Sequence, residues 1–268
     1  RAHLELFNHA VCDFVNGPIF SATLLKVASD RHVLVLGSHH LLTDGLSMVN
    51  VINEINVCYA ALRQGRPAQL LDPMQYRDFV RWHQAQADSD VMKAHEAYWI
   101  QQLARPLAPG DVPSDRPRPA VKTFAGAVRR ITMDAALVER ATKMAGARGY
   151  TPFMLLLAVY QLLLHRLSGD DTIVVGCPSA GRGLDRGDTV VGYCAHLLPI
   201  VSTLPASERV TVGEHLRRVR STLLDAFQHQ DYPFARLLNA LALKRDVSRA
   251  PVYSSLRSIV TRRSPAST

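Results

Sequence analysis

The sequence predicts a folded protein of the mixed α/β class. Segments rich in Val, Leu and Ile alternate along the chain with segments whose apolar residues recur every three or four positions. The first pattern is typical of strands and the second of amphipathic helices, so their alternation favours an α/β fold. Hydrophobic residues make up 47% of the 268 positions and charged residues 20%, a globular composition that argues against a disordered chain.

The first elements are predicted to be two strands and a helix. Residues 19–28 and 32–38 have the composition of strands, and the three polar residues between them suit a hairpin turn. Helical spacing follows over residues 49–62, with Ser47 as the N-cap. The turn residues of 63–73 then mark a candidate boundary between domains.

The middle of the chain is predicted to hold a helical region, an extended connection and a strand. The helical region covers residues 76–103 and contains three aromatic anchors. Five of the fifteen prolines lie within residues 106–119, which predicts an extended surface segment because proline fixes φ and lacks an amide hydrogen. Residues 123–133 have the composition of a strand.

Two consecutive helices are predicted next. Asp134 caps a helix that runs to about Arg148. The second helix begins at Thr151 and Pro152 and ends before Gly169, and its nearly uniform apolar surface predicts burial.

The last predicted elements are two buried strands and two helices. The strands cover residues 172–177 and 190–201. Residues 211–214 have the Thr-x-x-Glu pattern of a capping box and open a helix, and a short helix follows over about 234–243.

Composition also limits the function. The longest apolar stretch, residues 153–164, is shorter than the roughly 20 residues of a membrane-spanning helix. The four cysteines contain no CxxC pair, which favours reduced thiols in a cytoplasmic setting. The net charge is +8, and residues 216–268 alone carry 10 basic and 3 acidic groups. No nucleic-acid-binding motif accompanies these arginines, so an arginine-rich surface or an acidic protein partner is favoured over nucleic acid.

The densest polar cluster covers residues 37–47, where a predicted strand ends and a helix begins. On an extended backbone His39 and His40 point to opposite faces, so at most one of them lines a given cavity. Asp44 suits a role in holding a backbone or an arginine, and Gly45 permits a turn that other residues resist. A metal site would need further ligands, as in HExxH, and a serine triad would need GxSxG; neither pattern is present. Two interpretations stay open: two structural histidines, or one histidine that acts on a proton of a bound nucleophile.

Five motifs between residues 37 and 252 carry a resemblance to a known family. They are His39-His40-Leu-Leu-Thr-Asp44-Gly45-Leu-Ser47, Tyr76-Arg-Asp-Phe79-Val-Arg-Trp82, Val191-Gly192-Tyr-Cys-Ala-His196, His229-Gln230-Asp231-Tyr232-Pro233-Phe234 and Arg245-Asp246-Val-Ser248-Arg249-Ala-Pro251-Val. They resemble, in the same order, the HHxxxDGxS, YxDFAxW, VGxFxN, HQDxPF and RDxSRNPL segments of the condensation domains of nonribosomal peptide synthetases. One motif alone would be weak, whereas five in order are specific.

The resemblance implies a chloramphenicol-acetyltransferase-like α/β (α+β) fold, with two similar lobes in a V and the histidine motif at the middle of a central tunnel. Residues 1–72 would form the C-terminal part of the N-lobe, and residues 73–268 would form most of the C-lobe.

The implied activity is acyl transfer in the biosynthesis of a secondary metabolite. The amine of an acceptor aminoacyl thioester attacks a donor acyl or peptidyl thioester, and an amide bond forms. Both substrates are carried on the phosphopantetheine arms of carrier proteins. The implied partners are donor and acceptor peptidyl carrier domains and an adjacent adenylation domain of the same large chain. The domain itself would bind no cofactor and no metal.

The resemblance also assigns roles to residues. His40 would be the catalytic residue, which either accepts the ammonium proton or orients the amine and stabilises the tetrahedral intermediate. Asp44 would be structural and pair with an arginine, and His39 would be a packing residue. The site would be supported further by Gly45, which allows close approach, and by Arg182 of a GxPxAGR-like stretch. The residues expected to line the tunnel are Ser47, Tyr193 and His196.

Two departures from the family pattern bear on these expectations. His196 stands where the family has asparagine, which puts the local contacts of donor or acceptor in doubt. The family's two N-terminal motifs, one with an arginine suited to pair with Asp44, and its last strands and helix are absent from these 268 residues. We therefore expect an incomplete N-lobe with exposed sheet edges, an unstructured tail over 261–268, and little or no activity in the isolated chain.

Three alternatives to amide formation between carriers follow from the same residues. One is a related acyltransferase with a soluble acceptor, and another is an ester-forming or epimerisation domain. The third is a non-catalytic, condensation-like module that recruits a partner.

Overall fold

The computed structural model describes residues 12–104, 112–123, 125–205, 207–242, 246–249, 252 and 255–256. It divides into two compact units, and the chain enters the first unit twice. The first unit comprises Arg1–Ala87 and Ala180–Ala195, and the second comprises Asp88–Ser179 and His196–Thr268. Residues 73–87 and 180–195 therefore fold with the N-terminal segment, whereas the expected lobe boundary followed residue 72. The expected tail over 261–268 lies outside the described residues.

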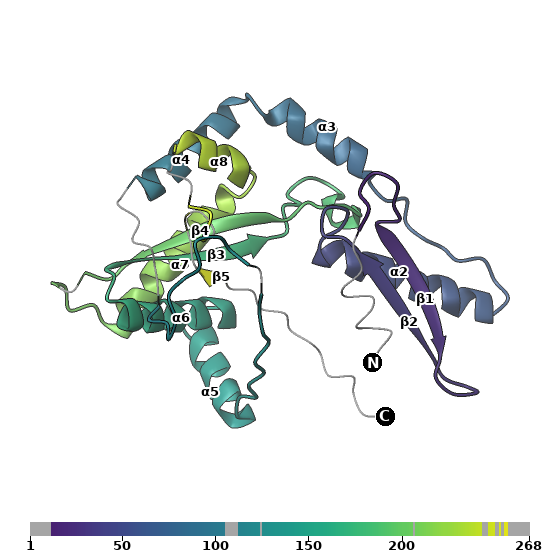
Figure 1. Cartoon of the computed structure of the whole chain (residues 1–268), viewed down its shortest axis with the longest axis horizontal. Helices are drawn as coiled ribbons and strands as arrows, with labels where there is room; N and C mark the ends of the chain where they lie inside the picture. Colours follow the sequence, from purple (N-terminus) through teal and green to yellow (C-terminus); the bar gives the residue numbers. More distant parts are fainter. Residues whose placement is uncertain are drawn as a thin grey trace. The chain divides into compact units, whose positions relative to one another are not determined.

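The first unit contains the predicted hairpin. Strands β1 (Phe20–Lys26) and β2 (His32–Ser38) are antiparallel, with Phe20 opposite Ser38 and Lys26 opposite His32 (Figure 1). They form a two-stranded sheet of their own, so each strand has one edge without a strand partner among the described residues.

Helix α2 (Gly45–Arg63) follows the hairpin, and its N-cap is Asp44 rather than the predicted Ser47. Asp44 has extended backbone, with φ −108° and ψ −178°, and its carboxylate accepts a hydrogen bond from the Ser47 amide. The prediction was wrong because the helix begins earlier than the apolar spacing, which starts only at Val49.

The helical region predicted over residues 76–103 is confirmed, and it consists of two helices. Helix α3 (Tyr76–Gln86) belongs to the first unit, and helix α4 (Asp90–Leu103) belongs to the second. Ser89 separates them because its backbone is extended and its hydroxyl caps α4 by accepting a hydrogen bond from the Met92 amide.

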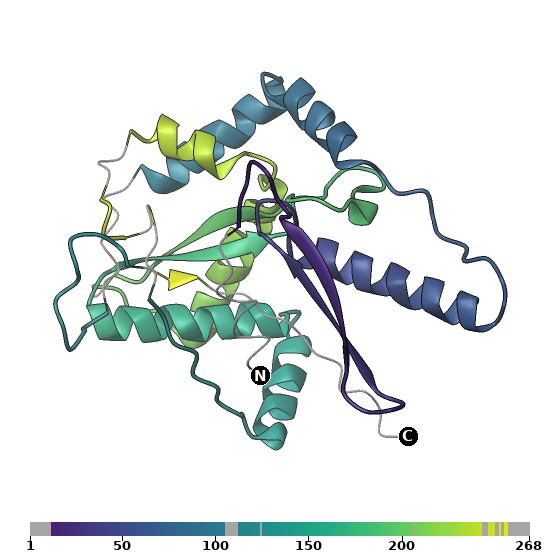
Figure 2. The ribbon, with the colours of Figure 1, turned by 45° about the vertical axis from the view of Figure 1, so that its right-hand side comes forward.

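The second unit is built around a three-stranded sheet of order β4-β3-β5. Strand β3 (Thr172–Ser179) pairs antiparallel with β4 (His196–Thr203) and parallel with the short β5 (Ser255–Leu256). Helices α6 (Pro152–Ser168) and α7 (Val212–Gln228) pack against the strands and against each other. Helix α8 (Phe234–Ala240) packs on β4 and on α4, away from α6 (Figures 1 and 2). Helix α5 (Ala135–Gly146) contacts α6.

Most local predictions in this unit are confirmed. Asp134, Thr151 and Thr211 cap α5, α6 and α7 through their side chains. Gly169 ends α6 with a φ of +75°, a conformation that glycine adopts at little cost. The short helix predicted to reach about residue 243 ends at Ala240.

Two strand predictions are wrong. Residues 123 and 125–133 contain no strand, although their composition suits one. The strand predicted over 190–201 begins only at His196, because a 3₁₀ turn over Gly187–Thr189 leads into a loop that bonds to helix α2. Apolar composition alone does not distinguish a strand from a buried loop.

The two units have unequal cores. The core of the second unit draws apolar side chains from both long strands and four helices, among them the fully buried Leu157, Val175, Ile200 and Leu223. Helix α6 is not buried all round, since Val159 and Leu163 are about half exposed. The small core of the first unit is made by Phe79, Val190 and Cys194. Among the described residues, no helix is long and apolar enough to cross a membrane.

Candidate functional site

The site is built on a buried ion pair at the start of helix α2. Arg182 donates from Nη1 to Oδ2 of Asp44 over 2.8 Å and from Nη2 to Oδ1 over 3.0 Å. Each side chain is 3% exposed. Two parallel hydrogen bonds between a guanidinium and a carboxylate are strong and directional, so this pair fixes the helix start relative to the loop after β3.

The carboxylate of Asp44 also accepts two backbone amides, from Ser47 over 2.9 Å and from Cys194 over 3.0 Å. Burial raises the pKa of Asp44, but the bonds from Arg182, Ser47 and Cys194 outweigh burial and lower its pKa to about 2. Asp44 is therefore ionised at neutral pH, and its oxygens already accept hydrogen bonds within the protein. This makes it unsuited to act as a proton acceptor.

Ser47 ties the helix to the loop around Gly192. Its hydroxyl accepts a hydrogen bond from the Gly192 amide over 3.0 Å and another from Nη2 of Arg182 over 2.9 Å. The Gly192 carbonyl, at 2.7 Å, and Oδ1 of Asp44, at 2.8 Å, compete for its single proton. Ser47 is fully buried, so the side chain expected to line a tunnel holds two segments together.

Gly192 is needed for close approach of the backbone to an aromatic ring. A Cβ atom at this position would overlap the ring of Tyr76. The hydroxyl of Tyr76 donates to the carbonyl of Tyr193 over 3.1 Å, and its pKa is raised by burial and by nearby groups including Asp44. Tyr76 and Gly192 therefore fix the position of the backbone at Tyr193.

The two histidines have different surroundings. His39 is half-buried, accepts a hydrogen bond at Nδ1 from the Leu41 amide over 3.1 Å, and packs edge-on against Phe14. His40 is exposed, and its ring lies edge-to-face with the ring of Tyr193, with centroids 5.3 Å apart. His40 therefore presents an accessible imidazole, whereas His39 is committed to its own loop.

Gly45 is the first residue of helix α2, and its φ is not in the left-handed region. A Cβ atom there would meet nothing within 4 Å. The expectation that Gly45 supplies a turn other residues resist is therefore wrong. The turn before α2 is made by the extended Asp44, whose side chain caps the helix.

His196 falls in the other unit, as the first residue of β4 opposite Ser179. The remaining sequence-predicted site residues belong to the first unit. Hydrogen bonds connect Asp44, Ser47 and Arg182 with one another. A ring contact connects His40 with Tyr193. Sequence analysis did not single out Tyr76, Gly192 or Cys194. The signal for all three was their place inside two of the motifs.

Cys194 is buried beside the ion pair. Its amide holds Asp44, and burial, together with the charge of Asp44, raises the pKa of its thiol to about 11 despite Arg182. A thiol of such basicity stays protonated at neutral pH and is a poor nucleophile. Among the described residues, no group of three metal-ligating side chains is present.

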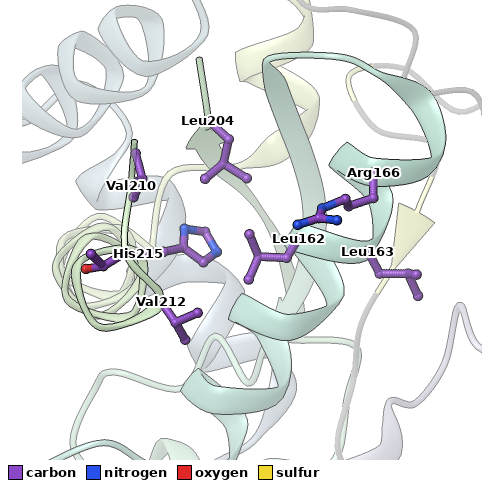
Figure 3. A pocket seen from close by; sticks show the side chains of 8 residues that line it. Leu162, Leu163, Arg166, Leu204, Val210, Val212 and His215 are labelled. Carbon is purple, nitrogen blue, oxygen red and sulfur yellow. The ribbon is translucent and has the colours of Figure 1, made fainter. Parts of the chain in front are cut away.

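A cavity of about 480 Å³ lies in the second unit between α6 and the start of α7. Figure 3 shows apolar side chains around it together with Arg166 and the ring of His215, which points from α7 toward Leu162. Nε2 of His215 donates a hydrogen bond to the Ala158 carbonyl over 3.1 Å, and burial lowers the pKa of this histidine. None of the sequence-predicted site residues lines this cavity.

The chain is thus a mixed α/β protein whose first unit carries an accessible histidine close to the start of a helix. A buried aspartate–arginine pair holds that helix start in place. The family model described as "Condensation domain" matches residues 9–260, and the chain belongs to this family. The predicted family is therefore confirmed.

The chain is similar to tyrocidine synthase 2 of Brevibacillus parabrevis, with 38% identity over 89% of this chain but only 6% of that protein. Among solved structures, the X-domain from teicoplanin biosynthesis, in complex with OxyB, matches 94% of this chain and 56% of its own, at 25% identity and a TM-score of 0.81. The first condensation domain of the calcium-dependent antibiotic synthetase matches 83% of this chain and 51% of its own, at 22% identity and a TM-score of 0.64. The predicted condensation-domain fold is confirmed.

Proposed function

We propose that this chain forms amide bonds between carrier-bound substrates in nonribosomal peptide synthesis, with His40 as the catalytic residue. The observation that carries the proposal is the accessible His40 imidazole, four residues before the buried Asp44 that Arg182 holds. Membership of the condensation domain family supports acyl transfer as the type of reaction.

In the proposed reaction the acceptor amine attacks the carbonyl carbon of the donor thioester. A C–N bond forms, the C–S bond breaks, and the thiolate leaves on the donor's phosphopantetheine arm. One proton must leave the amine, and the His40 imidazole either takes it or orients the amine and stabilises the tetrahedral intermediate. Because both reactants arrive tethered, positioning supplies much of the acceleration and no covalent nucleophile is needed.

The proposed partners are donor and acceptor carrier domains and an adenylation domain in the same synthetase. The similarity to tyrocidine synthase 2, of which this chain spans 6%, supports a place within a much longer protein. The substrates bring their own phosphopantetheine arms, so the reaction needs no cofactor bound by this domain. We also propose a cytoplasmic location, which the free thiols of Cys12, Cys58, Cys177 and Cys194 support.

The test is the His40→Ala variant in the native synthetase with its flanking carrier domains, with the product on the acceptor carrier measured by intact mass. We expect product formation to fall by roughly 10²–10⁴-fold, the usual contribution of a proton-transfer group. His39→Ala is the matched control, because that ring is engaged with Leu41 and Phe14, and we expect it to retain most activity. Undiminished product from His40→Ala would remove His40 from catalysis.

A second candidate is a module that recruits a partner without catalysis. The observation in its favour is the likeness to the X-domain, whose structure was solved as a complex with OxyB. A binding module would capture its partner equally well with His40→Ala and would form no amide product with either version. Activity of the unaltered synthetase that disappears in the variant would exclude this candidate.

A further inference from the structure

The orientation of the His40 ring needs an explanation, because a catalytic imidazole must aim one particular nitrogen at the proton. Among the described residues, no hydrogen bond holds the ring of His40, whereas His39 is held at Nδ1 by the Leu41 amide. The carboxylate of the same motif does not bond to His40, since Asp44 bonds to Arg182 and to two backbone amides. The usual device of a carboxylate behind the histidine is therefore absent from the described part of this chain.

The ring of His40 lies against the ring of Tyr193. The centroids are 5.3 Å apart and the planes are at 80°, an edge-to-face arrangement within the range that aromatic pairs favour. Tyr193 is 45% exposed, so the contact between the two rings lies at the surface of the described chain.

The backbone of Tyr193 is held on both sides. Gly192 bonds through its amide and carbonyl to Ser47, and the Cys194 amide bonds to Asp44. The Tyr193 carbonyl itself accepts the Tyr76 hydroxyl. Because three consecutive residues are tied to the buried ion pair and to α3, the base from which the Tyr193 ring projects is rigid.

We propose that Tyr193 is a positioning residue that sets the orientation of the His40 imidazole through its aromatic ring. This role rests on the proposed function of His40. This role requires the aromatic ring and not the phenol hydroxyl. Phenylalanine should therefore preserve the role, and an aliphatic side chain should not.

The kinetic test compares Tyr193→Phe and Tyr193→Leu in the native synthetase. We expect Tyr193→Phe to keep kcat within about twofold, and Tyr193→Leu to lower kcat by roughly 2- to 12-fold with little change in KM, as the loss of one aromatic contact implies. Tyr193→Gln is a second non-aromatic variant in case leucine disturbs folding. The matched control is Tyr59→Leu on α2, an exposed tyrosine of the same unit, which should leave kcat unchanged.

A spectroscopic readout separates positioning from activity. In the 268-residue chain with ¹³C-labelled histidine, the His40 ring signals are assigned by their loss in His40→Gln. We expect the ring current of residue 193 to persist in Tyr193→Phe and to disappear in Tyr193→Leu, which moves the His40 signals. If His40→Ala abolishes product while Tyr193→Leu retains full kcat, or if the His40 signals do not move, positioning by Tyr193 fails and the proposed function stands. If His40→Ala retains full activity, the proposed function fails, and the contact between Tyr193 and His40 then has no role in catalysis.

Discussion

Asp44 and Arg182 form a buried ion pair that joins the start of helix α2 to the loop after β3. Removing one partner leaves the other charge buried without compensation, which is more damaging than the loss of an exposed pair. We expect Arg182→Met to destabilise the first unit by about 3–5 kcal/mol in urea unfolding followed at Trp82. The control is Arg186→Met, which removes the exposed pair of Arg186 with Asp72 and should lower stability by at most about 1 kcal/mol. Equal effects of the two variants would contradict the burial argument.

The low pKa of Asp44 predicts a dependence of stability on acid. Folding lowers its pKa from 3.8 to about 2, so the folded state favours the carboxylate. The resulting stabilisation, about 2 kcal/mol, is complete above the unfolded pKa and is lost as pH falls through about 2. Chemical denaturation at a series of pH values should show this loss, and Asp44→Asn, already less stable, should show a shallower dependence. A variant as steep as the native chain would show that other groups cause the acid loss.

Gly192 tolerates no side chain while Tyr76 keeps its ring. A Cβ atom on residue 192 would overlap that ring, so we expect Gly192→Ala to destabilise the first unit by about 1–3 kcal/mol, the usual effect of overpacking. The double variant with Tyr76→Ala should recover part of this loss, and a double-mutant cycle from thermal unfolding measures the coupling. Strict additivity of the two changes would contradict the contact.

These residue-scale contacts mark the limit of what the sequence predicts. The motif pattern singled out Asp44 and Arg182 and assigned both to support of the site. Nothing local in the sequence shows that they meet, because 138 positions separate them and the contact depends on the fold as a whole. Gly192 and Tyr76 were not singled out for the same reason, since the close approach of one to the other also depends on the fold.

Among the elements, helix α4 meets the HQDYPF segment at a pair of histidines. Nδ1 of His95 lies 2.7 Å from Nδ1 of His229, so one nitrogen must donate and the other accept. Tyr98 stacks on the His229 ring, and Nε1 of Trp99 donates to the His229 carbonyl over 2.8 Å. Two imidazolium rings cannot make this contact, so the junction needs at least one neutral histidine.

Burial, and after it His95, lowers the pKa of His229, although Asp225 opposes the shift. A histidine whose pKa is lower in the folded state stabilises the fold above its unfolded pKa of 6.5, and this stabilisation is lost as pH falls below that value. We expect the protection of α4 amides from hydrogen exchange, measured relative to the intrinsic exchange rate at each pH, to fall between about pH 7 and pH 5. His95→Gln should weaken this dependence, because an amide keeps a polar partner for His229 without a second titrating ring. An unchanged pH dependence in that variant would exclude the pair as its cause.

Element-scale predictions succeeded where a local signal decides the structure. The caps at Asp134, Thr151 and Thr211 and the glycine at 169 mark helix ends through hydrogen bonds within a few residues. The strand prediction for residues 190–195 was wrong because these apolar residues form a loop that is bonded to α2. A loop and a buried strand can share the same apolar composition.

At the scale of the whole molecule, the two units should differ in stability. The core of the first unit rests on Phe79, Val190 and Cys194, whereas that of the second extends over two strands and several helices. Helix α2 also leaves Ile52 and Leu62 exposed to 46% and 74%. In hydrogen exchange followed by mass spectrometry we expect peptides of α2 to exchange before those of α6 and α7. Equal protection of all three helices would show that the chain unfolds as one unit.

The discontinuity of the first unit has a consequence for synthesis. Asp44 leaves the ribosome 138 residues before Arg182, and at about 5–20 residues per second the interval is on the order of ten seconds. During that interval α2 has its cap from Asp44 but no arginine, while much of the second unit is already being made. The Asp44 carboxylate of the nascent chain therefore stays solvated until Arg182 has been made. A pause or an early stop before residue 182 would therefore release a chain in which the histidine motif is complete in sequence but has no ion pair beneath it.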